Sequence, residues 1–183
     1  MNARARLRDA TRPQHDVVDE VYSRFDLSDA DDYGRFLTAQ SACFTAVETA
    51  LADRAQALLG DWTARTRAHL LAADLAALGL TPPAPIPAPA FADDAAVLGA
   101  VYVLEGSRFG GGVLAKRLPP GAPSNFLKAG GEPNAWRSFI TSLDLHLAED
   151  AALTSAISAA KAVFQCFETT GRHELERWHV GLV

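Results

Sequence analysis

The chain has 183 residues, 49% hydrophobic and 21% charged, which is typical of one compact globular domain with a sizeable core. A net charge of −5 argues against partners that need a broadly basic surface, such as nucleic acids or anionic membranes. The two cysteines, Cys43 and Cys166, form no CxxC pair, and the polar N-terminus has no apolar core of an export signal. We therefore expect a single cytoplasmic domain over residues 1–183, without nucleic-acid or membrane partners.

Apolar residues recur at helical spacing from one end of the chain to the other, and no convincing alternating strand occurs. In chain order, the predicted helices are Leu7–Arg24, Asp31–Leu59, Trp62–Leu78, Val97–Leu118, a helix from Pro133, and Asp150–Glu168. Thr11–Pro13 resembles a helix cap with proline in the first turn. The prolines of 81–94 exclude a regular helix and predict a rigid loop inside one domain. The fold class is predicted to be all-α.

The helix predicted over Val97–Leu118 is unusually rich in glycine, at positions 99, 106, 110, 111 and 112. Each glycine in a helix costs about 1 kcal/mol relative to alanine. Gly106 and Gly110 share one helix face, with Gly99 seven residues earlier on the same stripe. By spacing alone, a close crossing of two helices is the more common explanation. The alternative is that the bare backbone contacts a flat, bulky ligand and that the helix bends there.

Among possible sites of chemistry, His15 is the most informative residue. No histidine pair has HxxxH or HExxH spacing, and no GxSxG or phosphate-binding loop occurs. His15 has Asp19 one turn later and Arg12 and Arg8 one and two turns earlier, respectively, on the predicted helix. Taken alone, such a histidine is more often structural than a ligand. Taken with the glycine helix, it suits a flat, metal-centred, apolar ligand fringed with carboxylates, which is a description of haem.

Four segments carry a resemblance to a known family. They are LRDATRPQHDVVD (Leu7–Asp19), LGAVYVLEGSRFGGGVLAKRL (Leu98–Leu118), AWRSFITSL (Ala135–Leu143) and AAKAVFQCF (Ala159–Phe167). Together they resemble the haem oxygenase family, especially small bacterial members, some of which supply biliverdin to bacteriophytochromes. The resemblance implies a multi-helix fold with haem between the first helix and a glycine-kinked distal helix. It also implies that haem b, as cofactor and substrate, is cleaved to biliverdin, carbon monoxide and ferrous iron, using O2 and electrons from a ferredoxin or other reductase.

The resemblance also implies roles for individual residues. His15 matches the proximal iron ligand, Gly106 and Gly110 match the distal bend, and Ser107 matches a distal-pocket position. The side chains expected to reach the haem propionates are Arg8, Tyr102 and Arg137, with Arg12 and Lys128 as weaker candidates. Asp19 is expected either to orient the imidazole or to be a solvated carboxylate.

Two departures from the family pattern lie beside the glycines. Phe109 stands where a smaller aliphatic residue is common, and Arg108 is a large cation next to the bend; either could project outward harmlessly. An alternative function is therefore kept, a degenerate member that binds haem, a tetrapyrrole or a sensor kinase without turnover. A thiaminase-like enzyme on the same fold is a distant third, since neither cysteine lies near the glycine helix in sequence.

Overall fold

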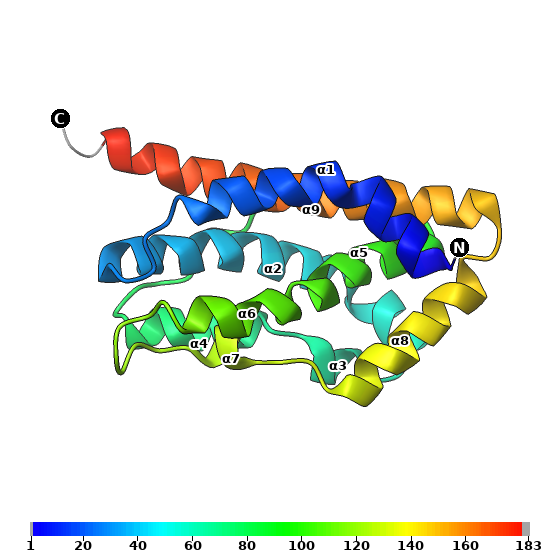
Figure 1. Cartoon of the computed structure of the whole chain (residues 1–183), viewed down its shortest axis with the longest axis horizontal. Coiled ribbons are helices and arrows are strands. Elements are labelled where there is room, and N and C mark those ends of the chain that lie inside the picture. The colour runs from blue at the N-terminus through cyan, green and yellow to red at the C-terminus, as the bar shows by residue number, and fades with distance from the viewer. Residues whose placement is uncertain (1, 181–183) are drawn as a thin grey trace.

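A computed structural model describes residues 2–180, and all regular structure in that range is helical (Figure 1). The helices of two turns or more are α1 (Ala3–Ser23), α2 (Ala30–Leu59), α4 (Ala68–Ala77), α5 (Asp94–Gly106), α6 (Arg108–Ala115), α8 (Pro133–His146) and α9 (Asp150–Val180). Two single turns, α3 (Trp62–Arg65) and α7 (Asn125–Lys128), complete the set. The prediction of an all-α fold is confirmed for these residues. None of the helices within 2–180 is long and apolar enough to cross a membrane.

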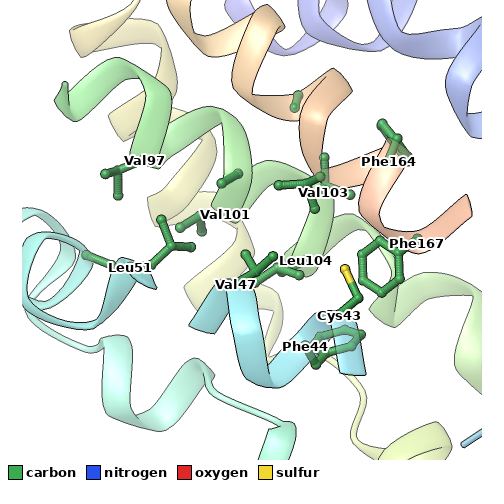
Figure 2. Close-up of a cluster of buried hydrophobic side chains, with 14 of the residues drawn as sticks. Cys43, Phe44, Val47, Leu51, Val97, Val101, Val103, Leu104, Phe164 and Phe167 are labelled. Carbon is green, nitrogen blue, oxygen red and sulfur yellow. The ribbon is translucent and has the colours of Figure 1, made fainter. Parts of the chain in front are cut away.

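The long helix α9 packs against α1, α2 and α5. In Figure 1, α1 and α9 run side by side, and α8 lies across the end of the molecule that carries the N-terminus. Figure 2 shows the centre of the core, where Phe44 and Val47 of α2 meet Leu104 of α5 and Phe167 of α9. The rings of Phe44 and Phe167 lie edge to face with centroids 5.3 Å apart. The core therefore holds α9 and α5 in fixed relation to α2.

The first helix starts earlier than the sequence predicts, and the cap assigned to Thr11–Pro13 is wrong. Asn2 is the N-cap, with its side chain accepting a 2.9 Å hydrogen bond from the amide of Ala5. Pro13 lies inside α1. Leu7 and Thr11 are buried one turn apart on the packed face. Packing of these early turns outweighs the one backbone hydrogen bond that the proline removes.

The predicted helix Trp62–Leu78 is two helices, because the buried carboxylate of Glu48 starts a new one. It accepts hydrogen bonds from the amides of Arg67, at 2.7 Å, and Ala68, at 3.0 Å. Those amides lie at the N-terminus of α4, where no helical carbonyl can pair them. The chain between α4 and α5 has no regular structure over residues 80–92, as the prolines predict.

The glycine-rich helix also divides, into α5 and α6, with the bend at Ser107. Arg108 does not project outward as expected, since its side chain is only 8% exposed and its Nε lies 2.9 Å from the carboxylate of Glu105. Glu105 also binds Arg65 at 3.2 Å, and Arg108 donates to the backbone carbonyls of Arg65 and Ala129. This buried charge cluster fixes the direction in which α6 leaves α5.

The glycines of α5 and α6 fall into two groups. A Cβ atom on Gly99 would overlap the backbone of Ala156 in α9, and one on Gly111 would overlap the carbonyl of Leu127. Close contact with neighbouring backbone therefore explains why glycine is needed at 99 and 111. The prediction that Gly99 shares a ligand-facing stripe with Gly106 and Gly110 is wrong. A Cβ on Gly106 or Gly110 would meet no atom within 4 Å.

Candidate functional site

A cavity of about 440 Å³ lies between α1 and the α5–α6 bend. In Figure 1, these elements occupy the upper and the lower middle part of the molecule, respectively. Helices α1, α2, α5, α6, α7 and α9 supply the apolar walls of the cavity. The apolar side chains that line it include Val18, Tyr22, Phe36, Val103, Leu114, Phe126, Leu127, Phe164 and Phe167. The volume is within the range of small-molecule and cofactor sites. The cavity can therefore accept an apolar ligand of substantial size.

His15 enters this cavity from α1. Its Nδ1 atom is 3.2 Å from a carboxylate oxygen of Asp19, one turn along the helix, and 4.0 Å from one of Asp16. The edge of the imidazole contacts Phe164, with ring centroids 5.8 Å apart. The side chain is 57% exposed. With Nδ1 directed at Asp19, Nε2 is the ring nitrogen that can ligate a metal ion.

Gly106 and Gly110 line the same cavity. A Cβ atom at either position would have open space around it, so the backbone of the bend itself forms this part of the wall. Gly112 also has open space around it but does not line the cavity. A flat ligand can thus approach the main chain at 106 and 110 to van der Waals distance.

The mouth of the cavity is basic. Arg4 and Arg8 from α1 and Tyr102 from α5 line it together with Trp136 of α8. Burial raises the pKa of Tyr102, while the positive charges of Arg4 and Arg8 act in the opposite direction. Cations at the rim of an apolar cavity suit a ligand that carries carboxylates at one edge.

Deeper in the cavity stands a buried cation that the sequence analysis missed. Arg67 donates hydrogen bonds to the hydroxyl of Ser107 at 2.6 Å and to the carbonyl of Leu104 at 2.5 Å. Its guanidinium lies over the rings of Phe44 and Phe126, at 4.7 and 5.1 Å from their centroids. Burial lowers the pKa of Arg67 to about 9, which leaves it protonated at neutral pH. The only sequence signal was an arginine in an alanine- and leucine-rich segment.

Known proteins resemble this chain in sequence and in structure. No family model matches the chain. It is 36% identical over 148 residues to the heme oxygenase of Xanthomonas campestris pv. campestris (strain 8004), covering 77% of this chain and 89% of that protein. The chain belongs to the haem oxygenase family.

Solved structures of haem oxygenases share the fold. The NO- and CO-bound enzyme of Neisseria meningitidis superposes with a TM-score of 0.81 at 24% identity, covering 95% of this chain and 92% of that one. The enzyme of Leptospira interrogans gives a TM-score of 0.71 at 20% identity, covering 93% and 98% of the respective chains. The multi-helix haem oxygenase fold predicted from the resemblance is confirmed.

The residues around the cavity fit the haem of a haem oxygenase. One imidazole nitrogen is available to iron, aromatic and aliphatic side chains can enclose the porphyrin, and bare backbone at Gly106 and Gly110 leaves room on the face opposite His15. The rim supplies the cations that propionates require. The donor set and the shape of the cavity thus agree with the group that the family binds.

Three of the residues expected to reach the haem propionates lie outside this cavity. Arg12 is exposed and its Nε is 3.9 Å from Asp16. Arg137 is exposed on α8, with Asn134 as a polar partner at 3.5 Å. Neither they nor Lys128 are among the residues that line the cavity. The residues of the sequence-predicted set that the structure does bring together are His15, Arg8, Tyr102, Gly106, Ser107 and Gly110.

Proposed function

We propose that this haem oxygenase binds haem b in the cavity between α1 and α6, where Nε2 of His15 would bind the iron and the backbone at Gly106 and Gly110 would leave room for the porphyrin. Haem oxygenases cleave haem to biliverdin, carbon monoxide and ferrous iron with O2 and external electrons, and the family assigns this reaction to the chain. Haem, when bound, supplies both the oxygen-activating iron and the carbon that is oxidised.

One observation supports placing His15 on one side of the bound haem and the two glycines on the other. Among the glycines of α5 and α6, Gly106 and Gly110 have empty space above the backbone and line the cavity that His15 enters, whereas Gly99 and Gly111 are filled by neighbouring backbone. Packing within the chain does not force glycine at positions 106 and 110. Glycine at both positions is therefore best explained by a ligand, and the oxygen that reacts with it, needing this space.

Asp19 acts through His15. A carboxylate 3.2 Å from Nδ1 favours the tautomer with the proton on Nδ1, and this leaves the lone pair of Nε2 for the iron. A neutral imidazole ligand matches oxygen-binding haem chemistry, in contrast to a thiolate, which favours cleavage of the O–O bond.

Arg67 and Ser107 provide the polar part of the pocket on the α6 side. The serine hydroxyl donates to the carbonyl of Leu104 at 2.7 Å and receives the guanidinium of Arg67, so its position is fixed by both. Gln40 also lines the cavity. These groups can hold ordered water beside the reacting face and thereby supply protons without a distal histidine.

Electrons come from a ferredoxin or another reductase, because the chain has no redox cofactor motif of its own. We place the enzyme in the cytoplasm, where such donors and reduced cysteines occur. Delivery of biliverdin to a bacteriophytochrome or sensor kinase is the use of the product that we favour, on the resemblance to small bacterial members.

Titration with haemin tests this function. The expected result is one haemin per chain with a Soret band, which His15→Ala displaces or abolishes, followed by decay of the band and growth of biliverdin absorption after ascorbate is added in air. Haemin that binds no better than to an unrelated helical protein would contradict the proposal. A bound haemin that survives reductant and oxygen would instead favour the binder without turnover.

A further inference from the structure

A second cavity, of about 1340 Å³, is separate from the one that His15 enters. It lies between α2, α9 and the proline-rich loop of residues 80–89. Helices α2 and α9 contribute to both cavities, but none of the described residues lines both. The second cavity thus gives access from solution to side chains of α2 and α9 that do not face the proposed haem site.

Cys166 of α9 is the thiol that the second cavity exposes. It is half-buried and lines this cavity together with Ala162, one turn earlier on the same helix. Cys43 of α2 is fully buried and lines neither cavity. Figure 2 shows Cys43, with its sulfur in yellow, in the buried cluster that also holds Phe44 and Phe167. A reagent in solution can therefore reach Cys166 but not Cys43.

The two thiols meet where α2 packs against α9. The thiol of Cys43 donates a hydrogen bond to the sulfur of Cys166, which lowers the pKa of Cys166. Burial, followed by this hydrogen bond, raises the pKa of Cys43. The thiolate is the reactive form of cysteine, so the accessible member of the pair is also the more reactive one. Because the sulfur atoms are already neighbours, a bond between them requires only a short movement of the two helices.

We propose that Cys166 is a site of oxidation by hydrogen peroxide, reached through the second cavity, and that Cys43 then closes a disulfide between α2 and α9. In the first step, the thiolate of Cys166 attacks one peroxide oxygen and the O–O bond breaks. A sulfenic acid and one water form, with uptake of one proton. In the second step, Sγ of Cys43 displaces the hydroxyl of the sulfenic acid, so an S–S bond forms and a second water leaves with the Cys43 proton.

Hydrogen peroxide suits both the cavity and the enzyme. It is small and uncharged, and proline, alanine and threonine make up most of the cavity wall. Haem oxygenases use O2 and external electrons, and two-electron reduction of O2 yields hydrogen peroxide. Thiol reductants reverse disulfides of this kind, which are usually transient in cytoplasmic proteins. Neither step involves haem, so the reaction can be followed on the haem-free chain and is independent of the proposed haem site.

Stoichiometric hydrogen peroxide added to the reduced chain, followed by mass spectrometry without reductant, tests the reaction. We expect the chain to lose the mass of two hydrogen atoms and to yield one peptide pair joined through Cys43 and Cys166, both reversed by dithiothreitol. Cys43→Ala should stop at the sulfenic acid, which dimedone traps at Cys166. Cys166→Ala should form the dimedone adduct at least about tenfold more slowly than Cys43→Ala, because its remaining thiol is buried and less acidic.

Access through the second cavity is tested by Ala162→Leu. Helical side chains lean toward the N-terminus of their helix, so a leucine at 162 would cover the thiol of Cys166 one turn later. Disulfide formation should then slow by at least about threefold, since access limits the reactions of thiols. Ala151→Leu is the matched control and should react at the wild-type rate, because this exposed position of α9 lies outside the cavity.

Three outcomes would overturn the proposed site. The first is a wild-type chain that keeps both thiols after peroxide treatment while Cys43→Ala gives no dimedone adduct. The second is a disulfide that joins two chains through Cys166, which would remove the role of Cys43. The third is equal slowing in Ala162→Leu and Ala151→Leu, which would show that peroxide does not enter through the second cavity. The peptide map of the wild-type chain decides the pairing even if a cysteine variant fails to fold.

Discussion

His15 and Asp19 lie one turn apart on α1, with Nδ1 of the imidazole 3.2 Å from a carboxylate oxygen. This contact favours the first of the two alternatives that the sequence left open, in which Asp19 orients His15. Asp19→Ala should therefore weaken haemin binding by about 10- to 100-fold, the usual effect of losing a group that orients a metal-ligating histidine. Haemin titration followed at the Soret band measures it. Asp16→Ala, whose carboxylate is 4.0 Å from the same atom, is the control, and an equal loss there would argue against a specific contact.

Gly110 and Gly112 lie two residues apart on α6, and a Cβ atom at either position would meet no atom within 4 Å, but only Gly110 lines the cavity. Gly110→Leu should therefore block the face opposite His15 and abolish biliverdin formation while His15 remains free to bind haemin. Gly112→Leu should keep turnover close to the wild-type rate. Single-turnover formation of biliverdin measures both variants. Equal activity of the two would remove the steric explanation of Gly110.

Gly99 and Gly111 should respond in the opposite way, through stability. Alanine at either position would press its methyl group into backbone of Ala156 or Leu127, and backbone in a packed core moves only at a cost of about 1–3 kcal/mol. Urea unfolding should show this loss of unfolding free energy. Gly112→Ala should instead stabilise the chain by up to about 1 kcal/mol, as expected for an open helical position. A neutral effect of Gly99→Ala would show that α5 and α9 can separate at little cost.

Asp93 caps α5 and gives the fold an acid-sensitive contact. Its carboxylate accepts from the amide of Ala96 at 2.7 Å and from the hydroxyl of Ser155 at 2.8 Å. These bonds, the amide first, lower the pKa of Asp93. The ionised form is thus favoured by folding, so its contribution is complete above about pH 4 and is lost as the pH falls through the lowered pKa.

Asp93→Ala should therefore lower the unfolding free energy at pH 7 by about 1 kcal/mol, as for other N-caps. The difference from the wild type should shrink below about pH 4, where the carboxyl of the unfolded chain takes up a proton. Chemical denaturation at neutral and at acidic pH measures this, and Asp93→Asn, which keeps an accepting oxygen, is the control. A difference that is the same at both pH values would contradict the contribution of the charge.

Sequence patterns predicted the helices best where apolar spacing was long and regular. The prediction for 31–59 agrees with α2 to one residue at its start. Prediction from sequence patterns failed where a side chain distant in sequence determines where a helix begins. The carboxylate of Glu48 starts α4 nineteen residues further along the chain, and Asp74 caps α7 through the amides of Asn125 and Phe126. Neither contact is visible in local propensity.

The cavity shows the same limit. His15 and Gly110 were found because their spacing and residue types are unusual within a helix. Arg67 was missed because its place in the cavity depends on a three-dimensional neighbour, Ser107. Arg12 lies one turn beyond Arg8 on the same helix, yet outside the cavity, since periodicity gives direction around an axis but not the extent of a pocket along it.

The separation of packed and open glycines on α5 and α6 bears on how this enzyme tolerates mutation. A Cβ atom at Gly106 or Gly110 would meet no atom within 4 Å, and alanine is a better helix former than glycine by about 1 kcal/mol. Screens that select only for thermostability or expression should thus accumulate substitutions at these two positions and discard those at Gly99 and Gly111. Variants substituted at these two positions are expected to be inactive yet more thermostable than the wild type. High stability is therefore a misleading criterion for choosing active variants of this enzyme.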